Sequence, residues 1–152
     1  MLFRSDRFAL TTDRLGFTPG QGSNRTDVYI FYDRAEQLAQ QQRAAQMVKL
    51  ALGIREPCAG IGPILGHVIA HELGHLLGLE THSPTGIMRA NWGSADWQET
   101  IYGYLSFTPQ QAEVIRAETG RRLQLIRLFQ NAVVGIAGTE QKLMSERRYL
   151  DH

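Results

Sequence analysis

Five residues near the middle of the chain, His71-Glu72-Leu73-Gly74-His75, constrain its fold and chemistry more than any other segment. Residues four apart share one face of an α-helix, so a helix here would direct both imidazoles at one metal ion. Glu72 follows the first histidine and is rotated by about 100° around the helix axis. From there its carboxylate can reach a water on the ion without ligating the ion, as a general base must. The segment therefore predicts a metal-binding helix with a catalytic carboxylate.

The residues around this segment are apolar, among them Val68, Leu76 and Leu77. Burying two histidines and a glutamate without a partner is costly in free energy, and a bound ion would offset that cost. Zinc is the expected ion, because it favours tetrahedral imidazole sites with one open position. The alternative is a metal-free α-helical interaction protein that carries the pattern by chance.

The stretch from His71 to Met88 resembles the metzincin clan of zinc peptidases, whose pattern is His-Glu-x-x-His-x-x-Gly-x-x-His followed by a methionine turn. Gly78 matches the glycine of the clan, and it can end the helix in a left-handed conformation. Gly86-Ile87-Met88 matches the methionine turn, which implies an apolar floor beneath the ion. Less specifically, residues 26–118 are similar to small bacterial proteins of this type.

The chain departs from the clan pattern at the third ligand, because position 81 is Thr81 and the histidine follows at His82. One additional residue can be absorbed in the loop, so we expect His82 to be the third ligand. Glu80 competes with it, because a carboxylate can also complete a zinc site. A glutamate from a later helix, Glu99 or Glu113, is disfavoured because neither lies in a matching motif.

Other polar and aromatic side chains near the motif are expected to have structural roles. His67 lies four residues before His71, but three successive histidines on one helix cannot easily bind one ion. We expect His67 to pack or to form a hydrogen bond near the first turn. Tyr102 and Tyr104 are expected to lie in the core or at the rim, and Trp92 and Trp97 are expected to cover the loop after the methionine turn.

The resemblance implies a zinc-dependent metallopeptidase that acts on a peptide or protein substrate. His71, His75 and His82 would hold Zn²⁺ with an open fourth position. Glu72 would take a proton from the zinc-activated water and pass it to the leaving amine. The alternative within the same family is a zinc-binding but catalytically inactive module that serves a partner.

The expected fold is α+β in a single domain over residues 1–152, a reduced version of the metzincin-like zincin fold. Residues 27–32 are aromatic and β-branched and predict a strand of a small sheet over the active-site helix. Helices are predicted at 34–52, from 63 or 64 to 77, at 109–118 beneath the active-site helix, and at 122–134. Residues 57–66 are expected to form a loop, residues 1–25 an irregular lead-in, and residues 135–152 a frayed tail.

The helix ends carry local signals. Asp33 is expected to cap the first helix and Gly53 to stop it. Thr108 is the expected cap of a later helix, with Pro109 at its first position and Gln111 completing a capping box. Thr119-Gly120 is expected to break that helix.

Charge and composition exclude several classes of function. Sixteen basic and fifteen acidic residues give a formal net charge of +1, so no electrostatic case exists for nucleic acid or an anionic membrane. No apolar run reaches the ~18–20 residues that span a bilayer. The first residues lack the apolar segment of a signal peptide, so we expect an intracellular protein, or a mature or truncated form. The single cysteine, Cys58, excludes an internal disulfide, and we expect it to be a small buried residue.

Overall fold

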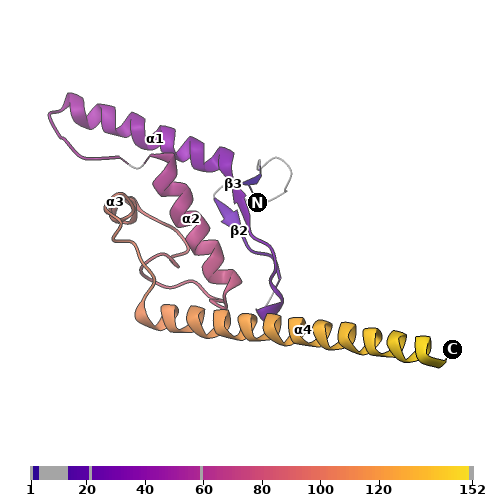
Figure 1. The fold of residues 1–152 in the computed structure, drawn as a ribbon. Helices are drawn as coiled ribbons and strands as arrows, with labels where there is room; N and C mark the ends of the chain where they lie inside the picture. Colours follow the sequence, from indigo (N-terminus) through magenta and orange to yellow (C-terminus); the bar gives the residue numbers. More distant parts are fainter. Residues whose placement is uncertain (1, 4–13, 21, 59, 151–152) are drawn as a thin grey trace. The chain divides into compact units, whose positions relative to one another are not determined.

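The computed structural model describes residues 2–3, 14–20, 22–58 and 60–150, which form helices and one small sheet (Figure 1). The prediction of an α+β chain is confirmed at this level. The chain divides into two compact units, Met1–Ile115 and Arg116–His152. The first holds the sheet and the residues of the predicted site. The described part of the second, residues 116–150, is helical throughout.

The sheet has three short strands in the order β1-β3-β2. β3 (Tyr29–Phe31) pairs in parallel with β1 (Leu2–Phe3) and antiparallel with β2 (Gly16–Phe17). β3 lies within the predicted strand. β2 and the short 3-10 helix η2 (Gly22–Asn24) lie in the segment expected to be irregular, so that expectation is wrong for them. Residues 1, 4–13 and 21 of that segment lie outside the described residues.

Helix α1 (Tyr32–Ala51) follows β3 without a loop. Asp33 therefore already lies inside the first turn and does not cap the helix, so the predicted cap is wrong. A carboxylate there still faces the positive end of the helix dipole. The predicted stop is confirmed, because Gly53 follows the helix with a positive φ of 80°.

Helix α2 (Ile61–Leu76) carries the histidine motif and begins earlier than predicted. The expected loop over 57–66 is wrong from Ile61 onward. Pro63 lies in the first turn, where its missing N–H leaves no helical hydrogen bond unmade. Ile64 and Val68 of α2 pack with Ile30 and other buried residues into one core cluster, so the helix lies against the sheet and α1.

Helix α3 (Ser94–Tyr102) was not predicted, because its mostly polar sequence lies in a stretch expected to form a loop. Its first turn is stabilised by Asp96, whose Oδ2 accepts hydrogen bonds from Gly93 N at 2.7 Å and from the Arg89 guanidinium at 2.8 Å. Cys58, expected to be buried, is half-buried.

Helix α4 (Pro109–Leu150) begins with the predicted capping box. Gln111 N donates to Thr108 Oγ1 at 3.3 Å, and Thr108 N donates to Gln111 Oε1 at 2.9 Å. The predicted break at Thr119-Gly120 is wrong, because Glu118 bonds to Arg121 and Arg122 at 2.7 and 2.8 Å and stabilises the turn across it. Of the tail expected to fray, residues 135–150 are helical, and 151–152 lie outside the described residues.

A second core cluster lies next to the site. It consists of Leu79, Ile87, Met88 and Leu105. Phe107, which precedes α4, and Ile115, which lies in α4, pack against this cluster. None of the described helices is both long and apolar enough to cross a membrane.

Candidate metal centre

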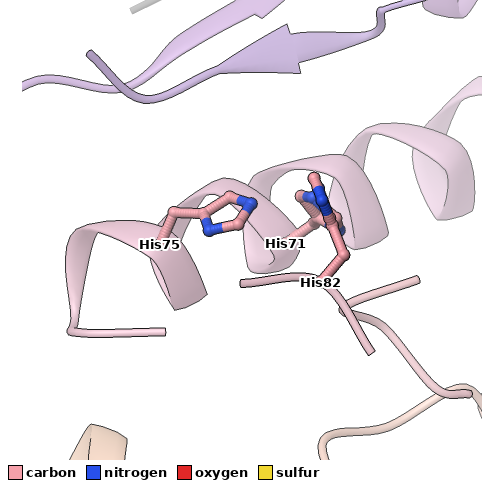
Figure 2. A group of neighbouring side chains, drawn as sticks. All are labelled: His71, His75 and His82. Atoms are coloured by element: carbon pink, nitrogen blue, oxygen red, sulfur yellow. The ribbon is translucent and has the colours of Figure 1, made fainter. Parts of the chain in front are cut away.

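Three histidines converge in the first unit. His71 and His75 project from one face of α2, and His82 comes from the loop after that helix (Figure 2). One nitrogen of each ring lies within 4.8 Å of the others. The ring centroids form a nearly equilateral triangle, with separations of 4.9, 5.0 and 5.3 Å. Among the residues that the structure describes, this is the one group of potential ligands that could hold a metal ion.

Backbone carbonyls orient the two helical imidazoles. His71 Nδ1 lies 2.7 Å from Ile87 O, and His75 Nδ1 lies 2.6 Å from Leu79 O. A carbonyl oxygen can only accept, so each Nδ1 carries the hydrogen and each Nε2 keeps its lone pair. Metal-ligating histidines use this arrangement, with one nitrogen donating to an outer partner and the other on the ion. The donor set therefore fits a metal site.

The protonation states also suit metal binding. Burial lowers the pKa of His71 to about 4, with the neighbouring imidazoles His75 and His82 adding to the shift. Burial also lowers the pKa of His75 and of His82. All three rings are therefore neutral near pH 7, which is the form that ligates metal.

The loop after α2 absorbs the additional residue that separates this sequence from the clan pattern. Gly78 has a φ of 98° and turns the chain, and Leu79 N donates to Gly74 O at 2.9 Å. Further on, Ser83 N donates to Met88 O at 2.8 Å, which fixes the residue after His82. The exposed Glu80 is not part of the histidine group. The structure thus brings together His82, rather than Glu80, with the two helical histidines.

Met88 lies against α2 behind the histidines. Its side chain is fully buried, and its Sδ lies only 2.6 Å from where a Cβ on Gly74 would be. Gly86 is required for a different reason, because its φ is 74° and its Cβ would lie 2.6 Å from Ser106 O. The turn that places Met88 also supplies the Ile87 carbonyl for His71. Met88 is thus packed against α2, and the residue before it is hydrogen-bonded to one of the histidines.

Glu72 is 5% exposed, and burial raises its pKa to about 7. The hydroxyl of Thr18 lies 2.8 Å from Glu72 Oε2 and 2.9 Å from Glu72 O. Its hydrogen bond to the carboxylate opposes the rise in the pKa of Glu72, as do the positive charges of Arg14 and Arg25. Gly16 of β2 crosses so close that its Cβ would lie 2.9 Å from Glu72 Cγ. No sequence signal identified Thr18 or Gly16, which meet Glu72 only through the fold.

Arg25 is another residue that the sequence analysis missed. It is 9% exposed, and its guanidinium donates to His75 O at 2.7 Å and to Gly20 O at 3.1 Å. A cation at the C-terminal end of α2 compensates the negative end of the helix dipole. Arg25 thereby ties the segment before β3 to the turn that carries His75.

The remaining candidates lie outside the histidine group. His67 forms a hydrogen bond through Nδ1 to Pro63 O at 2.9 Å, which confirms its expected role near the first turn. Glu99 and Glu113 are exposed. Tyr102 and Tyr104 are 56% and 74% exposed, which excludes the core and leaves the rim as the expected position.

A cavity of about 1110 Å³ opens over the site. His71, His75, His82 and Glu72 line it together with both tryptophans, Trp92 and Trp97. Trp92 also donates from Nε1 to Ile87 O at 3.2 Å, the carbonyl that orients His71. The arrangement places three potential ligands and a carboxyl group with a pKa near neutrality on the wall of one cavity.

Comparison of the chain with protein-family models, with curated proteins and with solved structures finds no match. Functional inference therefore depends on the residues of the site.

Proposed function

We propose that the chain is a zinc-dependent metallopeptidase of the metzincin type, with His71, His75 and His82 as zinc ligands and Glu72 as general base. The observation that carries this proposal is the pairing of two α2 imidazoles with backbone carbonyls at 2.7 and 2.6 Å beside a third imidazole. Three imidazoles with room for a further ligand are a donor set of catalytic zinc. The packing of Met88 beneath α2 supports the metzincin type.

Zinc bound at these imidazoles would polarise a substrate carbonyl and lower the pKa of a coordinated water toward about 7. Glu72, with a pKa of about 7, can accept a proton from an attacking water near neutral pH and release it to the leaving amine. Thr18 holds one carboxylate oxygen in place through its 2.8 Å hydrogen bond. The substrate is a peptide or protein whose scissile bond reaches the cavity wall formed by these residues.

Zinc content tests the ligand assignment. Wild type should retain one zinc per chain after dialysis, and His71→Ala, His75→Ala and His82→Ala should each lose it. His67→Ala is the matched control, since His67 lies on the same helix outside the group, and Glu80→Ala should also keep zinc. Retention by His82→Ala together with loss by Glu80→Ala would reassign the third ligand. Absence of zinc from wild type would contradict the metal site.

Peptide cleavage tests the catalytic role. Zinc-loaded wild type should cleave members of a mixed peptide library, and Glu72→Gln should keep zinc but lose about 10²–10⁴-fold in rate. The burial of Glu72 and its coverage by β2 favour one rival, a zinc-binding module without activity. If both proteins bind zinc and neither cleaves any peptide, that rival replaces the enzyme.

A further inference from the structure

The cavity over the histidines is lined by more cationic than acidic residues. Four arginines line it, Arg14, Arg25, Arg34 and Arg89, against three carboxyl residues, Asp33, Glu72 and Glu80. One of the three carboxyl groups, Glu72, is nearly removed from solvent and bonded to Thr18. Most of the charged side chains that line the cavity are therefore cationic.

Three of these arginines already have partners. Arg25 donates to two backbone carbonyls, at 2.7 and 3.1 Å. Arg89 donates to Asp96 at 2.8 Å. Arg34 donates to Arg14 O at 2.7 Å and lies 4.7 Å from the centroid of the Phe31 ring.

Arg14 differs from the other three. Its side chain is exposed on the cavity wall, and its guanidinium makes no hydrogen bond or ion pair with the rest of the described chain. Its backbone is nevertheless held, because Arg14 O accepts from Arg34 and the next residue, Leu15, accepts from Phe31 N at 2.8 Å. Arg14 lines the same cavity as the proposed general base Glu72 and the proposed third ligand His82.

We propose that Arg14 binds a carboxylate of the substrate, and that the site therefore acts on peptides with a carboxylate near the scissile bond. A guanidinium offers paired donors that match the two oxygens of a carboxylate, and such charge-assisted bonds are among the strongest in proteins. The carboxylate belongs either to an aspartate or glutamate side chain or to the C-terminus of a short peptide. This inference rests on the proposed peptidase function, and it adds the substrate class.

Matched peptides test it with the full-length, zinc-loaded chain. One set has an internal glutamate or glutamine at each position near the cleavage site and an amidated C-terminus. A second set has no acidic side chain and a free or amidated C-terminus. Wild type should prefer the carboxylate member of one set by about tenfold in kcat/KM, and the preferred set identifies the source of the carboxylate.

Substitutions then assign the preference to Arg14. Each variant is scored by the ratio of kcat/KM for the two members of a set, so that an effect common to both peptides cancels. Arg14→Gln should bring that ratio to about one, Arg14→Glu should reverse it, and Arg14→Lys should keep part of it. Arg43→Gln, an exposed arginine of α1 that does not line the cavity, is the matched control and should behave as wild type. A wild type without preference, or a preference that survives Arg14→Gln, would overturn the inference and leave the peptidase proposal intact.

A binding measurement separates this inference from the proposed function. Calorimetric titration of zinc-loaded Glu72→Gln with uncleaved peptides should give about tenfold tighter binding of the carboxylate member. The difference should vanish when Arg14→Gln is added to that variant. If wild type cleaves no peptide, the peptidase proposal fails, and this titration still decides whether Arg14 binds a carboxylate.

Discussion

Replacing Gly74 with alanine tests whether Met88 supports the helix that carries the histidines. A Cβ at this position would lie 2.6 Å from Met88 Sδ and 3.0 Å from Phe107 Cε1, and Met88 is fully buried. Overpacking of this kind costs about 1–3 kcal/mol of unfolding free energy. Replacing a helical glycine with alanine gains about 1 kcal/mol. The expected net loss of stability for Gly74→Ala is therefore ~0–2 kcal/mol.

Gly66 in the same helix is the matched control. A Cβ there would meet no atom within 4 Å, so Gly66→Ala should stabilise the protein by about 1 kcal/mol through helix propensity alone. Propensity cancels in the difference between the two variants, which should be ~1–3 kcal/mol. Urea unfolding followed by circular dichroism, in the presence of a chelator, measures both variants.

A double variant shows whether Met88 is the cause. In a Met88→Ala background the 2.6 Å contact is removed while the 3.0 Å contact with Phe107 remains. Gly74→Ala should therefore cost less stability than in wild type, and the two substitutions should not be additive. Because the same turn supplies the Ile87 carbonyl to His71, Gly74→Ala should also weaken zinc retention. If Gly74→Ala stabilises the protein as much as Gly66→Ala does, Met88 does not pack against α2 and the reasoning is refuted.

Three further predictions concern Glu72 and the residues that cover it. Burial raises the pKa of Glu72 in the folded state from 4.5 to about 7. In metal-free protein, wild type should therefore lose up to about 3 kcal/mol of stability relative to Glu72→Gln as pH rises from 4.5 through 7. Chemical unfolding measures this, and parallel pH profiles of the two proteins would contradict it. Thr18→Val removes the 2.8 Å hydrogen bond to the Glu72 carboxylate, which is ionised near pH 8. At that pH the substitution should lower the unfolding free energy by about 1–3 kcal/mol. Thr18→Ser should restore most of that stability, and failure of the serine to do so would assign the effect to packing. Gly16→Ala should lower the thermal midpoint by an amount equivalent to about 1–3 kcal/mol, because its Cβ would lie 2.8 Å from Tyr29 O and 2.9 Å from Glu72 Cγ; an unchanged midpoint would show that β2 does not cross Glu72.

Features set by neighbours in the chain could be predicted from the sequence. The spacing of His71 and His75 places both on one helical face, and the capping box joins Thr108 and Gln111, which are only three positions apart. Errors arose where the same local rules were outweighed. Thr119-Gly120 did not end α4, because ion pairs from Glu118 stabilise the turn across it. Helix α3 was not predicted, because its sequence is mostly polar.

The two helical histidines and the glutamate between them could be assigned from the sequence, because helix geometry relates residues four apart. Gly78 could be assigned as well, because glycine readily adopts the positive φ that ends a helix. The identity of the third histidine and the surroundings of Glu72 depend instead on tertiary contacts. The loop that carries His82 is held by the hydrogen bond from Ser83 N to Met88 O, and Thr18 and Arg25 reach α2 across 54 and 50 residues of chain. Such contacts depend on how β2 and β3 pack against α2, which spacing along the chain does not encode. Burial by this packing raises the pKa of Glu72 to about 7.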